Sequence, residues 1–379
     1  MKEDTKASNS TNRQQTRELS VAGTERPKIA ETLDAHRGEH HVIVLQDFPD
    51  PDAISSAYVH KLISAKFEID VDIIYTGRIS HQQNLALVRL LGVELTHFDE
   101  DLDLFGYNGS VFVDGQGTTS EEIVQALEAA GAPPLIIVDH HEKQDRLEPE
   151  FSDIRRTGAT ATIYTEYLMQ GLLELNKSRR EHSLAATALI HGIMTDTNGF
   201  IQAGPEDFQA VAFLSQYRDA DVLTQIVTQS RSKQVMEIIR QALGGRIIVE
   251  SFSIAGIGYV RSEDRDAIPQ AADFLLTEEN VHTAIVYGIL TGDDQRELLI
   301  GSLRTSKLTL DPDGFLKEVF GKDELDHYFG GGKMLAGGFG IPVGFLSGGN
   351  VEDYRDLKWQ VYDQQVKQKI FAKIGIEPD

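Results

Sequence analysis

The chain has 379 residues, of which 41% are hydrophobic and 25% are charged, a composition typical of a soluble globular protein with room for two domains. Its formal net charge of -23 disfavours a long nucleic acid as a partner, because binding to a phosphate backbone depends on clustered lysine and arginine side chains. The lack of cysteine excludes disulfides, thiolate metal sites and cysteine nucleophiles. A metal site in this chain must therefore be built from carboxylates and imidazoles.

Residues 1–38 are rich in charged and polar side chains and nearly lack aromatic ones, so we expect a disordered tail there. This segment lacks the continuous apolar stretch of a signal peptide, and no later apolar run reaches the length of a membrane span. We therefore expect a cytoplasmic protein with no membrane partner. A homodimer is compatible with the sequence but is not determined by it.

From residue 39 to residue 217, segments with the pattern of β strands alternate with segments with the pattern of helices. The predicted strands are short apolar runs rich in β-branched residues, at residues 41–45, 71–75, 111–114 and 135–138. Apolar residues with helical spacing are found at residues 53–67, 81–91, 121–131, 157–175, 184–200 and 207–217. This alternation predicts an α/β domain in which right-handed crossovers join parallel strands.

The second half of the chain has the pattern of a smaller α/β unit. We expect a helical linker at residues 218–245, which ends at a glycine pair. Four predicted strands and a helix follow within residues 246–348. A C-terminal helix is expected within residues 349–379.

Acidic residues and histidines stand at or after the carboxyl ends of three predicted strands. The set comprises Asp50 and Asp52, Asp114, and Asp139 with His140 and His141, and it is joined by Asp196 near the end of a later helix. Each residue alone has an ordinary alternative as a helix N-cap or a loop residue. In a parallel sheet these strand ends share one edge, where gathered carboxylates repel one another unless cations lie between them. The set therefore predicts a site for two divalent metal ions, which suits phosphoester hydrolysis.

The glycine-rich segment GGGK at residues 330–333 is a second candidate for a functional site. It is not a Walker A loop, because Met334 stands where that motif requires serine or threonine. The remaining interpretations are a tight structural turn, or a backbone nest whose amides hold an anion together with Lys333. Arg304, at the end of a predicted strand, is either a surface charge or a phosphate clamp.

Residues 40–348 resemble the DHH phosphoesterases with a C-terminal DHHA1 domain, in particular the nanoRNase and pAp-phosphatase group. The resemblance rests on motifs in the order that the family has them: PDPD at 49–52, VD at 113–114, VDHHE at 138–142 and GIMTDT at 192–197. In the second half, SLRT at 302–305 and FGGGKMLAGGF at 329–339 are similar to the substrate-binding elements of DHHA1 domains.

The resemblance implies a catalytic DHH domain at residues 39–217 and a DHHA1 domain at 246–348, and it assigns a role to each residue of the motifs. Asp50 would hold a first metal, Asp52, His140 and Asp196 a second, and Asp114 both. Asp139 would orient His140, and His141 would lie near the scissile phosphate. The far part of the substrate would be bound by Arg304, Gly330, Gly331, Gly332 and Lys333.

The chain departs from the family pattern at two positions. Gln46 stands where the family has a histidine in its first motif, and Lys333 replaces the last residue of a GGGH motif. A neutral amide in place of an imidazole should weaken the first metal position or favour a harder ion such as Mg2+ over Mn2+.

The resemblance implies a hydrolase that uses water activated by two metal ions, Mn2+ foremost and Mg2+ as the alternative. The implied substrates are short oligonucleotides, linear dinucleotides or 3′-phosphonucleotides. Two alternatives remain: a catalytically reduced, nucleotide-binding regulatory protein, and an inorganic pyrophosphatase or polyphosphatase.

Overall fold

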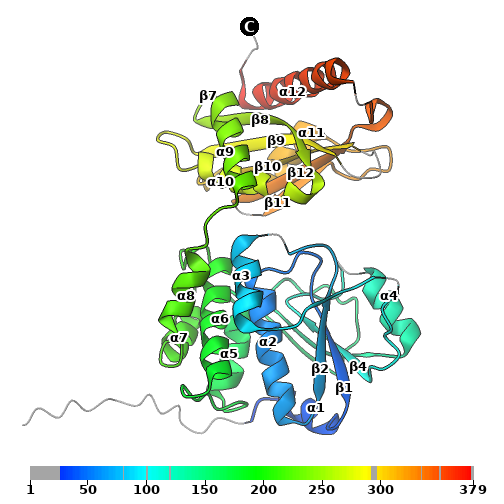
Figure 1. The fold of residues 1–379 in the computed structure, drawn as a ribbon, viewed down its shortest axis with the longest axis vertical. Helices are drawn as coiled ribbons and strands as arrows, with labels where there is room; N and C mark the ends of the chain where they lie inside the picture. Colours follow the sequence, from blue (N-terminus) through cyan, green and yellow to red (C-terminus); the bar gives the residue numbers. More distant parts are fainter. Residues whose placement is uncertain are drawn as a thin grey trace, which may run out of the picture. The chain divides into compact units, whose positions relative to one another are not determined.

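The computed structural model describes residues 26–79, 81–99, 101–118, 121–291, 297–333, 335–349 and 351–376 (Figure 1). These residues form two compact units, of which the first contains residues 26–79 and 86–227. The second contains residues 81–85 and the chain from residue 228 onward. Each unit has a six-stranded sheet and hydrophobic cores of its own. The expected tail lies outside the described residues up to residue 25.

The sheet of the first unit is parallel throughout and has the strand order β3-β2-β1-β4-β5-β6. Its strands are β1 (His40–Val44), β2 (Asp70–Tyr75), β3 (Thr96–His97), β4 (Gly109–Val113), β5 (Pro134–Asp139) and β6 (Phe151–Ile154). Strand β4 is buried along its whole length, as expected for a strand covered on both faces. The short strands β3 and β6 were not predicted, because neither has an apolar run.

Helices cover both faces of this sheet, as Figure 1 shows for α4 on one side and α2 on the other. They are α1 (Ile29–Ala35), α2 (Pro51–Lys66), α3 (Gln82–Leu91), α4 (Glu121–Ala130), α5 (Thr160–Met169), α6 (Arg180–Asp196), α7 (Pro205–Leu214) and α8 (Ala220–Val227). Successive strand residues contribute to different cores: Val111 joins the core under α2, α5 and α6, whereas Phe112 joins the core under α4. The strand period of two thus separates the two cores.

Helix α1 lies inside the segment that we expected to be a disordered tail, so this expectation is wrong for residues 29–35. Ile29, Ala30 and Leu33 are fully buried in the core of the first unit. Their spacing places them on one face of a helix, and one apolar face is enough to hold even this polar segment on the domain. The average composition of residues 1–38 conceals this short amphipathic stretch.

The sheet of the second unit is mixed and has the strand order β11-β12-β10-β9-β8-β7. Only β8 and β9 pair in parallel among the described strands of this sheet; the other pairs are antiparallel. The strands are β7 (Ile247–Val249), β8 (Phe252–Arg261), β9 (Thr283–Thr291), β10 (Glu297–Thr305), β11 (Gly330–Lys333) and β12 (Ala336–Pro342). Helices α9 (Lys233–Gly245) and α10 (Ala267–Leu275) contribute to one core, and α11 (Pro312–Phe320) and α12 (Glu352–Ile374) belong to the other side. Two 3-10 turns, Ser262–Asp264 and Gly344–Leu346, complete the unit.

The segment 218–245, expected as one helical linker, contains α8 and α9, of which α8 belongs to the first unit and α9 to the second. Among the helices of the described residues, none has both the length and the apolar composition needed to cross a bilayer.

The glycine-rich segment 330–333 is neither a tight turn nor a nest. It is the edge strand β11, and it pairs antiparallel with β12 in the register Gly330 to Phe339. A Cβ atom at Gly332 would lie 2.7 Å from the carbonyl oxygen of Ala336 in β12 and 2.9 Å from Pro312 in α11, and one at Gly330 would lie 3.1 Å from Leu316 in α11. Strand β12 and helix α11 together leave little room for side chains at these two positions.

Candidate metal centre

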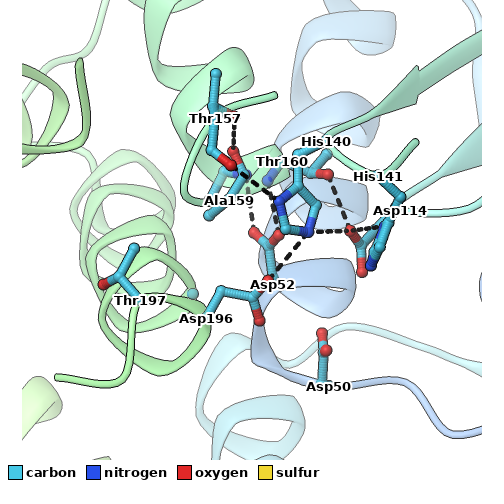
Figure 2. A network of polar contacts seen from close by, with 12 residues as sticks. Asp50, Asp52, Asp114, His140, His141, Thr157, Ala159, Thr160, Asp196 and Thr197 are labelled. Carbon is cyan, nitrogen blue, oxygen red and sulfur yellow. Dashed lines mark hydrogen bonds and ion pairs between the residues drawn. The ribbon is translucent and has the colours of Figure 1, made fainter. Parts of the chain in front are cut away.

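The carboxyl ends of β1, β4 and β5 bring most of the predicted site residues together in the first unit (Figure 2). Asp50 caps the N-terminus of α2, where its carboxylate accepts the Ala53 amide at 2.9 Å. Pro51 follows at the first helical position, where its missing N–H is no loss. Asp52 therefore stands in the first turn of α2, which begins at this edge of the sheet.

Asp52 is fully buried, and its carboxylate faces the N-terminus of α5. Its two oxygens accept the backbone amides of Thr160 and Ala161, each at 2.7 Å. These amides belong to the four that a helix leaves unpaired at its start, and the positive end of the helix dipole favours a carboxylate there. Helix α5 thus fixes the orientation of Asp52.

Asp114 follows β4 directly and has a left-handed backbone, with φ of 57°. Aspartate tolerates this conformation better than most residues, and the turn directs the buried carboxylate into the site. One carboxylate oxygen accepts the Thr160 hydroxyl at 2.9 Å. The other accepts the side-chain amide nitrogen of Gln46 at 3.4 Å.

His140 lies between two of the carboxylates, as Figure 2 shows. Its Nε2 is 3.1 Å from Asp196 and 3.6 Å from Asp114. Its Nδ1 donates to the carbonyl of Thr157 at 3.2 Å, so in the neutral imidazole the proton is on Nδ1 and Nε2 has the lone pair. Nε2 is buried and faces the carboxylate of Asp196. A buried nitrogen in this position can bind a metal ion once its proton has been displaced.

Asp139 contacts His141 and not His140, so the role that the resemblance gave it is wrong in this respect. Its carboxylate accepts Nδ1 of His141 at 2.8 Å and the backbone amide of the same residue at 3.2 Å. The other oxygen accepts the side-chain amide of Gln116 at 2.7 Å. The residue that orients His140 is instead Thr157, through its carbonyl. In an extended chain the side chains of residues i and i+2 lie on the same side, so the strand geometry favours the pair Asp139 and His141 over Asp139 and His140.

The predicted ligands form two overlapping groups of possible metal donors. One contains Asp52, His140 and Asp196, and the other contains Asp114, His140 and His141. Asp50 belongs to neither group. Gln46 presents its amide nitrogen to Asp114, not its oxygen. The residues assigned to the second metal thus converge, whereas those assigned only to the first do not.

Burial and mutual repulsion raise the pKa values of three acidic side chains in this cluster, Asp50, Asp52 and Asp114. For Asp50, burial and the charge of Asp196 raise the pKa to about 6. For Asp52 and Asp114, burial and the neighbouring carboxylates raise the pKa well above its usual value. Burial lowers the pKa of His140, but Asp196 and Asp52 outweigh this effect and raise it to about 9. The cluster gathers negative charge that a cation would neutralise.

Asp139 differs from the other carboxylates. Burial raises its pKa, but the hydrogen bonds from His141 and Gln116 outweigh burial and lower the pKa below its usual value. It therefore stays ionised beside His141, whereas Asp50, Asp52 and Asp114 bind protons more readily than usual.

The donor set fits a hard or borderline divalent cation. Carboxylate oxygens and one imidazole suit Mn2+ and Mg2+ better than softer ions, and the buried Nε2 of His140 lies between the carboxylates of Asp196 and Asp114. Sequence reasoning missed Gln116 and Thr160, which hold Asp139 and Asp114. The sequence contains one indication of the role of Gln116, since this residue stands two positions after Asp114 in the loop that follows β4.

The predicted substrate residues lie in the second unit, around a concave pocket of about 630 Å³. Arg304, Gly330 and Gly331 line it, whereas Gly332 and Lys333 are not among its lining residues. Gly332 donates its amide to Asp313 at 3.1 Å, and Lys333 is exposed. The Nε atom of Arg304 is 2.9 Å from Asp273. Arg304 is therefore a half-buried, paired cation at a pocket rather than a free surface charge.

No protein-family model matches the chain. It is 34% identical over 369 residues to the uncharacterized protein MJ1633 of Methanocaldococcus jannaschii, a match that covers 96% of this chain and 70% of the relative. Among solved structures, an exopolyphosphatase-related protein from Bacteroides fragilis has a TM-score of 0.64 at 16% identity, covering 89% of this chain and 96% of that one. The exonuclease RecJ bound to manganese has a TM-score of 0.49 at 13% identity, covering 94% and 96%.

The structural likeness to the exopolyphosphatase-related protein extends over nearly the whole of both chains, so it includes both units. The α/β architecture expected from the sequence, a parallel-sheet domain followed by a second α/β domain, is therefore confirmed. The chain belongs to the same protein family as MJ1633, and it has the DHH/DHHA1 architecture, the fold of the exopolyphosphatase-related protein.

Proposed function

We propose that the chain is a metal-dependent phosphoesterase. The observation that supports this most strongly is the convergence of Asp52, Asp114, His140 and Asp196, with the buried Nε2 of His140 lying 3.1 Å from Asp196 and 3.6 Å from Asp114. Buried like charges are unfavourable unless a cation compensates them, so the arrangement favours metal binding over a purely structural role. We expect Mn2+ foremost, with Mg2+ as the alternative.

The four converging residues would hold one metal, and Asp50 with Gln46 would contribute to a weaker position beside it. When bound, the metal neutralises the carboxylates and supplies Lewis-acid chemistry toward a phosphoryl oxygen. Thr160 and the N-terminus of α5 keep Asp114 and Asp52 oriented. This preorganisation reduces the cost of arranging the ligands during the reaction.

His141 and Asp139 form a hydrogen-bonded pair, suited to proton transfer, at the edge of the cluster. Asp139 accepts from Nδ1 of His141, so a proton on Nδ1 is stabilised and Nε2 is left to accept or donate one. Gln116 fixes the opposite oxygen of Asp139. The ring of His141 is 35% exposed, so a phosphate oxygen can reach it. We assign the pair to proton transfer during phosphoester hydrolysis.

The pocket of the second unit supports a small phosphorylated substrate. Its volume of about 630 Å³ is in the range of sites for small organic ligands, and Arg304 places a guanidinium at its wall. We propose short oligonucleotides, linear dinucleotides or 3′-phosphonucleotides as substrates. The backbone of Gly330 and Gly331 lines the same pocket without side chains that would obstruct a ligand.

The test is hydrolysis by the purified chain, with Mn2+ and with Mg2+, of pApA, pAp, pyrophosphate and polyphosphate. We expect turnover of a nucleotide substrate. The decisive variant is Asp114→Asn, because asparagine also tolerates the left-handed backbone and removes only the charge. We expect kcat/KM to fall at least 100-fold, an effect on the order of 3 kcal/mol.

Glu142→Gln is the matched control, because Glu142 is an exposed carboxylate beside His141 and belongs to neither donor group. It should retain full activity. Normal rates in Asp114→Asn would refute the proposed centre.

A specific observation favours a second candidate, a catalytically reduced nucleotide-binding protein. Gln46 directs its amide nitrogen to Asp114, and Asp50 is outside both donor groups, so the first metal position is poorly formed. Nucleotide binding by calorimetry without turnover of any of the four compounds would identify this alternative. Turnover of polyphosphate or pyrophosphate alone would instead identify an inorganic phosphatase.

A further inference from the structure

A second group of histidine and glutamate side chains lies at the opposite edge of the first sheet. His36 caps the C-terminus of α1, and Glu39 and His41 follow at the start of β1. The carboxyl edge with the candidate metal centre is a full strand away, on the order of 15 Å for a five-residue strand. The two groups share no residue.

One oxygen of Glu39 is shared by two imidazoles. Its Oε2 is 2.8 Å from Nδ1 of His36 and 3.0 Å from Nε2 of His41. The three donor atoms offered by these residues lie within 4.8 Å of one another. The side chain of His41 is 1% exposed, so its imidazole is shielded from solvent and its position is fixed by the strand. The fold therefore holds these three side chains together, unlike surface side chains that only happen to lie near one another.

A second carboxylate completes the pattern. The remaining ring nitrogen of His36, Nε2, is 3.0 Å from Glu150, a residue 114 positions away in the chain. Metal-ligating histidines usually donate their other ring N–H to a carboxylate, which fixes the tautomer and increases the basicity of the ligating nitrogen. Glu150 occupies this supporting position for His36. This long-range contact is independent of the Glu39 contacts and indicates the same function.

We propose that His36, Glu39 and His41 bind a divalent transition metal of the Zn2+ class, with Glu150 as the supporting carboxylate. Two imidazoles and one carboxylate are a ligand set for Zn2+ and not for Mg2+, which prefers oxygen alone. The ion takes the place of the protons that otherwise lie between the imidazoles and Glu39. It joins α1 to the first strand, in a chain that has no cysteine with which to make a structural crosslink.

The experiment measures Zn2+ bound by the full chain, prepared without a polyhistidine tag and stripped with a chelator. Titration is followed by calorimetry and the stoichiometry by elemental analysis, in excess Mg2+. We expect His36→Asn and Glu39→Gln each to bind one Zn2+ fewer than the unmodified chain, or to bind it at least ten-fold more weakly. Both residues are partly exposed, so the variants should fold, and circular dichroism confirms this.

His40→Asn is the matched control. His40 lies between Glu39 and His41 but faces Asp72, at 3.0 Å, and is outside the group. It should bind Zn2+ with the stoichiometry of the unmodified chain. Unchanged binding in both test variants, loss in only one of them, or loss in His40→Asn overturns the assignment.

Asp196→Asn separates this inference from the proposed function. Asp196 belongs to the candidate metal centre and not to the His36 group, so this variant should retain the Zn2+ that His36→Asn loses. Loss of the same Zn2+ in Asp196→Asn would show that the ion binds at the catalytic edge, and it would overturn the second site while leaving the phosphoesterase proposal intact.

Discussion

Gln46 is the residue of the candidate centre whose contacts suit a metal least. Its Nε2 donates to Asp114 at 3.4 Å, so the amide satisfies a carboxylate instead of offering an oxygen to a cation. An imidazole here could present a lone pair in the same direction.

Replacing this residue tests whether it limits metal affinity. We expect Gln46→His to tighten Mn2+ binding on the order of ten-fold, since an imidazole is a better ligand than an amide for this ion. Calorimetric titration measures the change. Gln46→Asn, which keeps the amide, is the control and should not tighten binding. An unchanged affinity in Gln46→His would contradict a role for this position beside the metal.

Asp139 is predicted to affect proton transfer without affecting metal binding. In Asp139→Asn the negative charge that stabilises the proton on Nδ1 of His141 is removed, while the size of the side chain is kept. We expect kcat to fall on the order of 100-fold and the Mn2+ stoichiometry to stay unchanged. Steady-state kinetics and metal analysis of the same preparation measure both.

Asp145→Asn is the control for this prediction, because Asp145 is an exposed carboxylate in the loop after β5. It should keep the original kcat. A loss of metal in Asp139→Asn would show that Asp139 is itself a ligand.

At the scale of elements, the close contact between α2 and α6 places Asp52 and Asp196 in one site. Gly192 lies at this contact, where a Cβ atom would be 2.6 Å from the Ser55 hydroxyl and 3.1 Å from Cα of Asp52. The second neighbour is backbone of the helix that carries a predicted ligand, so it cannot move without moving the site.

We therefore expect Gly192→Ala to lower the free energy of unfolding by about 1 to 3 kcal/mol, the usual cost of overpacking. We also expect Mn2+ affinity to decrease, because α6 must shift relative to Asp52. Urea unfolding and calorimetry measure the two effects. Gly244→Ala is the matched control, since a Cβ atom at this position would meet no atom within 4 Å and α9 tolerates alanine. Equal stability and affinity in Gly192→Ala would contradict this account of the helix contact.

At the scale of the whole molecule, a buried histidine makes stability depend on pH. His60 is fully buried in α2, and its Nδ1 contacts the Tyr164 hydroxyl at 2.8 Å. Burial, with a smaller contribution from His41, lowers its pKa to about 3, whereas an unfolded histidine titrates near 6.5. Between these values the unfolded chain binds the extra proton. The contribution of His60 to stability is therefore complete above pH 6.5 and decreases as the pH falls toward 3.

The difference in unfolding free energy between the unmodified chain and His60→Gln should consequently change with pH, by up to about 1.4 kcal/mol per pH unit within this window. Urea unfolding at a series of pH values measures it. Tyr164→Phe keeps the buried imidazole and should follow the pH profile of the unmodified chain. A difference independent of pH would show that His60 is not a neutral buried group.

The local pattern of the sequence determined the fold class and most of the candidate ligand set. Alternating apolar strands and amphipathic helices require a parallel sheet, and a parallel sheet brings the residues after its strands to one edge. Asp114, His140 and the two aspartates before and in α2 could therefore be found from their positions after apolar runs. The helix α1 could not, because its three buried residues are outnumbered by polar ones when composition is averaged.

Only the tertiary structure decided which side chains contact one another. The supporting contact of Gln116 and the place of Gln46 relative to Asp114 depend on side-chain direction within about an ångström. The glycines of β11 are a motif in the sequence, and the structure shows that the close approach of β12 and α11 leaves little room there for side chains. Periodicity specifies which face of an element is buried. Contacts between residues far apart in the chain depend instead on how the elements pack against one another, and no local sequence pattern specifies this packing.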